Sequence, residues 1–316
     1  MGVLGNIAAA AGLLAAAGAG ETIYFYNRTM KRGNAKTERT AKMSGTDWEQ
    51  YFPLMEERKE FVMAKEHRDV YVTSFDGLKL HATYFPALDK KRDKAVICFH
   101  GYTGEGLSNH VAIAGYFLKH GYSILLPDAR AHGGSEGEYI GFGCLDRKDA
   151  LVWIDWLIQE GGKDIQIMLH GTSMGGATVL MASGLELPAN VKGIVSDCGF
   201  TSPKEVFTHV LNHRYHLPAF PAIQGADLLN KRLAGYGMDE CNAKYEVRKA
   251  KVPILFIHGS ADTFVPCSMC CEIYENCRSP KRKLIIEGAA HAESYYKNME
   301  RYEKELDAFA ERIFSC

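Results

Sequence analysis

Short apolar runs alternate with helix-length segments through the second and last thirds of the chain, and this alternation limits the possible folds more than any other feature. Six runs of four or five residues have the length and composition of buried strands: 95–99, 123–126, 165–169, 193–196, 254–257 and 283–286. Segments with a helical period lie between or after them, at 109–120, 147–159, 174–184, 268–277 and 294–314. Buried strands that alternate with helices predict a parallel sheet covered by helices on both faces.

Two further strands are expected before this alternation begins. Residues 70–75 and 78–85 are rich in β-branched and aromatic side chains, and the pair Asp76-Gly77 joins them. Asp-Gly between two such runs is a strong signal for a β-hairpin. We therefore expect an α/β fold with an eight-stranded, mostly parallel sheet.

One long segment, residues 200–248, interrupts the alternation between the fourth and fifth parallel strands. A connection of that length inside a compact domain is usually functional or carries its own elements. It contains two helical pieces, 203–214 and 226–233, separated by Pro218 and Pro221. We predict a small helical lid inserted over one end of the sheet.

The amino-terminal segment predicts a membrane anchor. Residues 3–20 carry no charged side chain and would extend roughly 27 Å as a helix, near the thickness of the hydrocarbon core. Eight alanines and four glycines make its insertion marginal, while the aromatic group at 24–26 suits the membrane interface. We expect residues 1–26 to be an anchor, and residues 27–67 to be a basic connector followed by a packing helix at 48–66.

The charges beside this segment predict its orientation. No lysine or arginine precedes it, and six basic residues follow: Arg28, Lys31, Arg32, Lys36, Arg39 and Lys42. The positive-inside rule then places the rest of the chain in the cytoplasm, and nine cysteines, an odd number, fit a reducing compartment. A cleaved signal peptide of a secreted protein and a surface or buried helix of a soluble cytoplasmic protein remain open as alternatives.

A serine motif lies where a predicted strand meets a predicted helix. The pattern G-x-S-x-G, centred on Ser173, directly follows the run 165–169 and opens the helix 174–184. Such a turn holds the serine in a strained conformation with its hydroxyl exposed, and the flanking glycines remove side chains that would collide there. The motif in this context predicts a nucleophilic serine.

An aspartate and a histidine follow two later strands. Asp262 lies just beyond the run 254–257, and His291 lies just beyond the final run. A serine hydroxyl needs a base and an orienting carboxylate, and the carboxyl ends of parallel strands share one edge of the sheet. We expect Ser173, His291 and Asp262 to form a catalytic triad, with Asp197, after the fourth parallel run, as a rival for the acid.

The remaining catalytic part is an oxyanion hole. His100, Gly101 and Tyr102 follow the first parallel strand. The backbone N–H of Tyr102 and that of Met174, the residue after the serine, are the two expected donors. We expect His100 to be structural, because a second catalytic histidine would have no task.

These residues, together with the stretch Asp-Ala-Arg-Ala-His-Gly-Gly-Ser at 128–135, resemble the α/β-hydrolase superfamily, in its serine aminopeptidase and monoglyceride-lipase-like branch. The resemblance covers roughly residues 68–315 and implies a hydrolase domain at 68–316. It further implies hydrolysis of an ester, thioester or amide through an acyl-enzyme, without a cofactor. The oxyanion strand lacks the triple-glycine form of many lipases, and no amino-terminal propeller like that of prolyl oligopeptidases is present, which disfavours a broad lipase or an oligopeptidase.

Aromatic side chains of the predicted lid indicate a pocket for an acyl or alcohol group: Phe207, Tyr215 and Phe220. Glu105, after the oxyanion turn, is a candidate for contact with a polar substrate group. We expect a carboxylesterase that acts on small to medium acyl substrates. A peptidase or acyl thioesterase of the same fold remains open, because the lid rather than the triad selects the leaving group, and a non-catalytic, membrane-tethered binding protein is a remote alternative.

Charge and ligand spacing argue against other functions. The 37 basic and 38 acidic side chains give a net charge of -1, so nucleic acid is not an expected partner. Three cysteines of the group at 267–277 share one helical face, and no second ligand pair with zinc-site spacing occurs elsewhere. His209 and His213 lie one helical turn apart without a nearby third ligand. We expect no metal ion and no cofactor.

Overall fold

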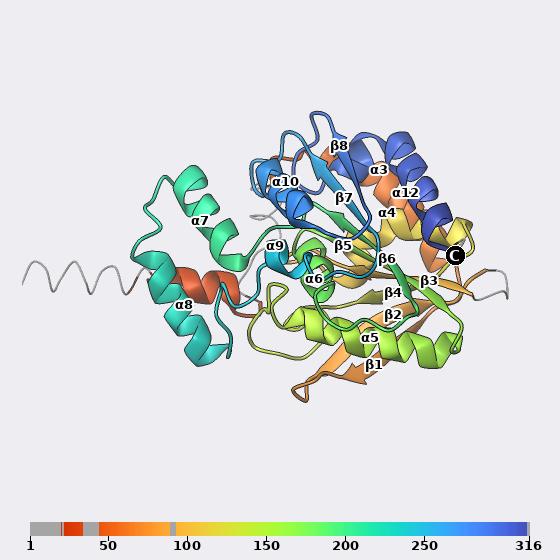
Figure 1. Cartoon of the computed structure of the whole chain (residues 1–316), viewed down its shortest axis with the longest axis horizontal. Coiled ribbons are helices and arrows are strands. Elements are labelled where there is room, and N and C mark those ends of the chain that lie inside the picture. Colours follow the sequence, from red (N-terminus) through yellow and green to blue (C-terminus); the bar gives the residue numbers. More distant parts are fainter. Residues whose placement is uncertain (1–19, 21, 34–43, 89–92, 315–316) are drawn as a thin grey trace, which may run out of the picture.

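The computed structural model describes residues 20, 22–33, 44–88 and 93–314, and its centre is an eight-stranded sheet (Figure 1). In chain order the strands are β1 (Arg68–Thr73), β2 (Lys79–Phe85), β3 (Lys94–Phe99), β4 (Ser123–Pro127), β5 (Gln166–Thr172), β6 (Val191–Asp197), β7 (Ile254–Gly259) and β8 (Lys281–Ile286). Their order in the sheet is β1-β2-β4-β3-β5-β6-β7-β8. Among these eight strands, β2 alone runs opposite to the others, so it is antiparallel to both β1 and β4. The expected eight-stranded, mostly parallel sheet is confirmed.

The central strands are apolar on both faces because helices cover both faces. Along β3, Val96 and Cys98 belong to one cluster of buried side chains, whereas Ala95, Ile97 and Phe99 belong to the other. The first cluster includes residues of α3 (Phe52–Met63), α4 (Gly106–Lys119) and α12 (Met299–Phe314) (Figure 1). The second includes residues of α5 (Asp146–Gly161), α6 (Met174–Ala182) and α10 (Cys267–Asn276).

Two predicted helices are divided in the structure. The segment 48–66 forms the short 3-10 helix η1 (Glu49–Tyr51) followed by α3. The expected single helix at 294–314 is wrong, because α11 (Ser294–Lys297) ends before α12 begins. Asn298 between them has φ −151° and ψ 76°, and its Oδ1 accepts a hydrogen bond from the backbone N–H of Arg301 at 3.1 Å. The asparagine thus ends one helix and caps the next.

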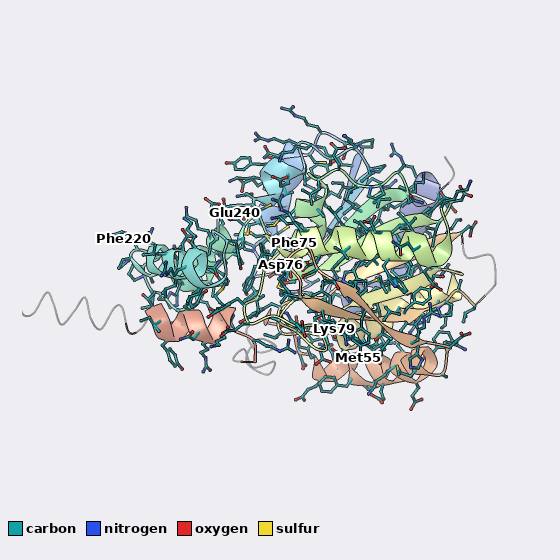
Figure 2. The ribbon with its side chains drawn as sticks, turned by 90° about the horizontal axis from the view of Figure 1, so that it is seen from below. Met55, Phe75, Asp76, Lys79, Phe220 and Glu240 are labelled. Carbon is teal, nitrogen blue, oxygen red and sulfur yellow. The ribbon has the colours of Figure 1, made fainter. Side chains whose placement is uncertain are left out.

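Residues 200–248, which we call the insertion, form helices at one side of the sheet (Figure 1). They are α7 (Pro203–Arg214), α8 (Ala222–Leu233) and the short α9 (Ala243–Glu246). Ser202 caps α7 by accepting a hydrogen bond from the backbone N–H of Glu205 at 3.2 Å. The second predicted helical piece begins earlier than expected, at Ala222. Phe220, before α8, is 72% exposed at the outer tip of the insertion (Figure 2).

A helix of residues 22–30 packs against both the insertion and the body of the protein. Tyr26 and Met30 are buried on it. The hydroxyl of Tyr26 donates to Oδ1 of Asn230 in α8 at 3.1 Å, and the carbonyl of Met30 accepts from the backbone N–H of Ile140 at 2.9 Å. The helix of residues 22–30 therefore extends the core of the body.

Most of the predicted membrane anchor lies outside the described residues, which omit 1–19 and 21. Within the part of the chain that the structure describes, we find no helix with the length and apolar character needed to cross a bilayer. Arg32, in the predicted basic connector, donates from its guanidinium to the carbonyls of Gly133 and Ser135. The described part of this region thus contacts the body of the protein.

Met30→Ala tests whether the helix of residues 22–30 is part of the folded core. The side chain of Met30 is 0% exposed, so its truncation removes buried apolar area and leaves a cavity, at a cost of about 2–5 kcal/mol in the free energy of unfolding. Ile23→Ala on the same helix is the control, because Ile23 is 49% exposed and its truncation should change stability by no more than about 0.5 kcal/mol. Urea unfolding measures both, and equal effects of the two substitutions would contradict the docked position.

Candidate active site

Ser173 occupies the sharp turn between β5 and α6, in a backbone conformation that few residues adopt. Its φ is 56° and its ψ is −112°, a region that is costly for any residue with a Cβ. A Cβ at Gly171 would overlap the carbonyl of Gly175, and a Cβ at Gly175 would overlap the carbonyl of Phe99. Only glycines therefore allow β3, β5 and α6 to approach closely enough to form this turn.

The side chains of Ser173, His291 and Asp262 form a hydrogen-bonded series at this edge of the sheet, as the sequence predicts. Oγ of Ser173 lies 2.8 Å from Nε2 of His291, and Nδ1 of His291 lies 2.7 Å from Oδ2 of Asp262. Since the carboxylate can only accept, Nδ1 carries the proton and donates to it, which leaves Nε2 to accept from the serine hydroxyl. All three residues are buried.

The carboxylate of Asp262 has more partners than the histidine alone. Its Oδ1 accepts from the backbone N–H groups of Phe264 at 2.9 Å and Val265 at 2.8 Å. Nε2 of His258, on β7, lies 3.3 Å from Oδ2. Burial alone would raise the pKa of Asp262, but His291 and His258 hold it well below its usual range. Asp262 therefore stays ionised and orients the imidazole of His291.

His258 is a site residue to which the sequence analysis assigns no role. Burial alone would lower its pKa, but the hydrogen bond to Asp262 raises it well above the ordinary value. Its Nε2 also lies 2.8 Å from the carbonyl of Val265. The only signal in the sequence is its position four residues before the expected acid, at the end of a buried strand.

Asp197, the rival acid, lies outside this series. It ends β6, and its carbonyl accepts from the backbone N–H of Ser173 at 2.8 Å. Burial raises the pKa of its carboxyl to about 6, with the nearby His258 opposing the shift. Asp197 therefore supports the serine turn through its backbone, while Asp262 contacts the histidine.

The turn after β3 lies beside the serine. Gly101 donates from its N–H to Oδ1 of Asn109 at 3.1 Å, and its carbonyl accepts from Nδ1 of His100 at 2.7 Å. Nε2 of His100 in turn accepts from the backbone N–H of Ala129 at 2.9 Å. Burial lowers the pKa of His100 to about 4, which matches this neutral tautomer. His100 thus ties the turn that carries Tyr102 to the stretch at 128–135.

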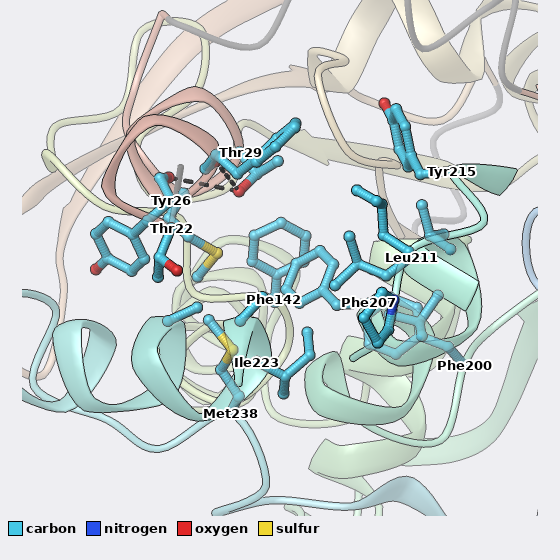
Figure 3. Close-up of a pocket in the computed structure, with 18 of the residues that line it drawn as sticks. Thr22, Tyr26, Thr29, Phe142, Phe200, Phe207, Leu211, Tyr215, Ile223 and Met238 are labelled. Atoms are coloured by element: carbon cyan, nitrogen blue, oxygen red, sulfur yellow. Dashed lines mark hydrogen bonds between the residues drawn. The ribbon is translucent and has the colours of Figure 1, made fainter. Parts of the chain in front are cut away.

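Two cavities meet at Ser173, and both are also lined by Tyr102 and Phe264. The first, which we call the insertion cavity, has a volume of about 250 Å³ and lies between the insertion and the helix of residues 22–30 (Figure 3). It is lined by the three aromatic residues predicted to form a pocket, Phe207, Tyr215 and Phe220. Glu105 lines neither cavity, because it is exposed at the start of α4. A substrate contact at Glu105 is not supported.

The second cavity, which we call the α3 cavity, has a volume of about 490 Å³ and lies on the other side of the serine. Its wall includes Trp48, Phe52 and Met55, with His110 and His170 buried at its base. Burial lowers the pKa of both histidines to about 3, so they are neutral. Among the described residues that line the two cavities, there is no lysine, arginine or glutamate.

One group in the described part of the chain has the spacing of metal ligands: Cys198, Asp262 and His291, whose ligand atoms lie within 4.8 Å of one another. Asp262 and His291 already belong to the hydrogen-bonded series with Ser173. Burial raises the pKa of the Cys198 thiol well above its ordinary value, so the sulfur is a protonated, weak ligand. Nε2 of His209, one of the two insertion histidines that lie one helical turn apart, lies 3.1 Å from the carbonyl of Thr263.

Comparisons with known proteins identify the fold and the broad class of this chain. A family model described as the alpha/beta hydrolase fold matches residues 94–221, and a model described as serine hydrolase (FSH1) matches residues 169–292. The Bacillus subtilis protein YqkD is 32% identical over 218 residues, which cover 69% of this chain and 71% of YqkD. The Escherichia coli protein YfhR is 24% identical, with coverage of 72% of this chain and 74% of YfhR.

Solved structures are similar in fold. An esterase of Pyrococcus furiosus superimposes with a TM-score of 0.63 at 25% identity, over 79% of this chain and 94% of the esterase. The acylaminoacyl peptidase of Pyrococcus horikoshii gives a TM-score of 0.59 at 18% identity, over 78% of this chain and 42% of the peptidase. The second likeness concerns the fold alone.

Asp197→Asn tests the electrostatic difference between the two aspartates. Because the pKa of Asp197 is raised to about 6 in the folded protein, its ionisation opposes folding above pH 6, and this cost disappears as the pH falls toward 4. The neutral asparagine should therefore raise the free energy of unfolding by about 1–3 kcal/mol at pH 8, and by less at pH 4.5.

Urea unfolding at pH 8 and pH 4.5 measures the effect of Asp197→Asn on stability, and Asp262→Asn is the matched control. The pKa of Asp262 is lowered in the folded protein, so its charge contributes stability above the unfolded pKa, and this stability is lost as the pH falls. Asp262→Asn should therefore destabilise the protein at pH 8. A loss of stability for Asp197→Asn at pH 8, or a gain that is equal at both pH values, would contradict the assignment.

Proposed function

Since this chain is a serine hydrolase of the α/β-hydrolase family, we propose that it cleaves neutral carboxylic esters with small to medium acyl groups. The observation that carries the proposal is the continuous hydrogen-bonded series from Ser173 through His291 to Asp262. A serine becomes a nucleophile when a neutral imidazole accepts its proton and a carboxylate holds that imidazole in place. The same series argues against a non-catalytic binding protein.

In the first half of the reaction, Oγ of Ser173 attacks the ester carbonyl while Nε2 of His291 takes the hydroxyl proton. The carbonyl oxygen becomes an oxyanion, which accepts hydrogen bonds from the backbone N–H groups of Tyr102 and Met174. The tetrahedral intermediate then breaks its bond to the alcohol oxygen, which receives the proton from His291. The products of this half are the alcohol and an acyl-Ser173 ester.

In the second half, water replaces the alcohol. Nε2 of His291 takes a proton from water as the water oxygen attacks the acyl carbonyl, and the same two amides hold the oxyanion. Collapse of the intermediate breaks the bond to Oγ, and His291 returns the proton to Ser173. Asp262 remains ionised throughout and stabilises the imidazolium that forms in each half.

The composition of the two cavities supports an ester over a thioester or a peptide. Phosphate groups of a coenzyme A thioester usually bind lysine or arginine, and the described lining of both cavities contains neither. An aminopeptidase needs a carboxylate for the free amino group of its substrate. Asp197 is the one carboxylate among the described residues that line the two cavities, and it is buried with a raised pKa. Both alternatives are therefore less supported.

Substitutions in the series test the proposed reaction. Ser173→Ala and His291→Ala should each lower kcat for p-nitrophenyl butyrate by about 10⁴ to 10⁶, and Asp262→Asn should lower it somewhat less. Ser183→Ala is the control, because Ser183 lies at the other end of α6 and lines neither cavity. Near-normal turnover by purified, folded Ser173→Ala would refute the proposal.

A substrate panel tests the preference for neutral esters. The unmodified protein should have a kcat/KM for p-nitrophenyl butyrate at least about 100-fold above that for butyryl-coenzyme A or an aminoacyl p-nitroanilide, since a buried unpaired charge on the substrate costs several kcal/mol. A higher kcat/KM for either charged substrate would replace the ester with a thioester or a peptide as the proposed substrate.

A further inference from the structure

We propose that the helix of residues 22–30, which precedes the sheet in the chain, forms the wall of the acyl site that limits the length of the acyl group. This inference rests on the proposed ester hydrolysis, because it assigns the acyl group to the insertion cavity. That cavity is lined by uncharged side chains among its described residues, and it opens onto Ser173. The α3 cavity, with its neutral histidines, then receives the alcohol.

One face of this helix forms the wall. The helix residues that line the insertion cavity follow the spacing i, i+3, i+4, i+7 and i+8: Thr22, Phe25, Tyr26, Thr29 and Met30. This spacing places side chains on a single stripe of a helix. Ile23 and Tyr24, off that stripe, are 49% and 57% exposed. Figure 3 shows the side chains of Thr22, Tyr26 and Thr29 beside Phe142 and opposite Leu211 and Tyr215.

The end of the helix at Thr29 is hydrogen-bonded to Tyr102, which lines the cavity next to Ser173. The hydroxyl of Tyr102 donates to the carbonyl of Thr29 at 2.9 Å, and the backbone N–H of Tyr102 is one of the two proposed oxyanion donors. Phe25 lies four residues before Thr29, about 6 Å along the helix axis, and Thr22 lies about 10 Å along it. An acyl group that extends from Ser173 along this helix therefore meets Thr29 first and Phe25 later.

The distant end of the wall is closed by contacts with the insertion. The rings of Phe25 and Tyr215 lie 6.1 Å apart, edge to face. At Gly225 of α8, an added Cβ would lie 3.0 Å from Cγ2 of Thr22, so the two helices already approach closely there. Together with the hydrogen bond between Tyr26 and Asn230, these contacts hold the helix against the insertion, at the end of α7 and along α8. The size of the side chain at position 25 then sets the depth available to an acyl group.

Substitution of Phe25 in both directions tests this inference in the full-length chain. We measure kcat/KM for p-nitrophenyl acetate, butyrate, octanoate and dodecanoate. Phe25→Ala should raise the octanoate-to-butyrate ratio by about tenfold or more, because each further methylene that fits contributes about fourfold through burial of about 0.8 kcal/mol. Phe25→Trp should lower the same ratio. A change in the amount of folded enzyme alters all substrates equally and leaves this ratio unchanged.

Tyr24→Ala is the matched control, since Tyr24 is the adjacent aromatic residue on the exposed face of the helix. Its ratio should stay within about twofold of the unmodified protein. If the two Phe25 variants hydrolyse esters with the unmodified ratio, or if Tyr24→Ala shifts it equally, the inference is wrong while ester hydrolysis stands. If the unmodified protein neither hydrolyses these esters nor reacts with a fluorophosphonate, the proposed function itself fails.

Discussion

The backbone conformation at Ser173 is the constraint on which the rest of the site depends. A positive φ at a residue with a Cβ persists only where the surrounding structure holds it, and here the close contact of Gly175 with Phe99 and the hydrogen bond from the serine N–H to Asp197 hold it. The turn brings Oγ to His291 and leaves it between two cavities. Loss of this geometry would separate the nucleophile from both its base and its substrate.

The charge of each buried aspartate in the site depends on whether its carboxyl group has hydrogen-bond donors around it. Asp262 accepts two backbone hydrogen bonds and faces two histidines, so a buried charge is stable there. Asp197 lies at the end of the neighbouring strand, equally buried, and its pKa is raised instead. Two buried aspartates at the same edge of the sheet thus have pKa values that are shifted in opposite directions. Only Asp262, which is surrounded by hydrogen-bond donors, stays ionised and can orient the imidazole of His291.

The strands and the three side chains of the series were predictable because each gives a local signal: a short apolar run, a glycine-flanked serine, or a polar residue just after a strand. The positions of His258 and Glu105 in the site could not be predicted from such local signals. The role of His258 depends on the loop that folds Asp262 back toward it. Glu105 lies close in the chain to the turn at His100–Tyr102, but its side chain is exposed to solvent at the start of α4. The helix of residues 22–30 has the spacing of an amphipathic helix, yet its partners, such as Asn230, are some 200 residues away, and nothing local identifies them.

A crystal structure of the chain after reaction with an alkyl phosphonate ester, which mimics the tetrahedral intermediate, tests the proposed catalytic arrangement most directly. We predict phosphorus bonded to Oγ of Ser173, with the phosphoryl oxygen within about 3 Å of the backbone nitrogens of Tyr102 and Met174, and the alkyl chain in the insertion cavity beside Phe25. Phosphorus on any other residue, or a phosphoryl oxygen directed away from both amides, would contradict it.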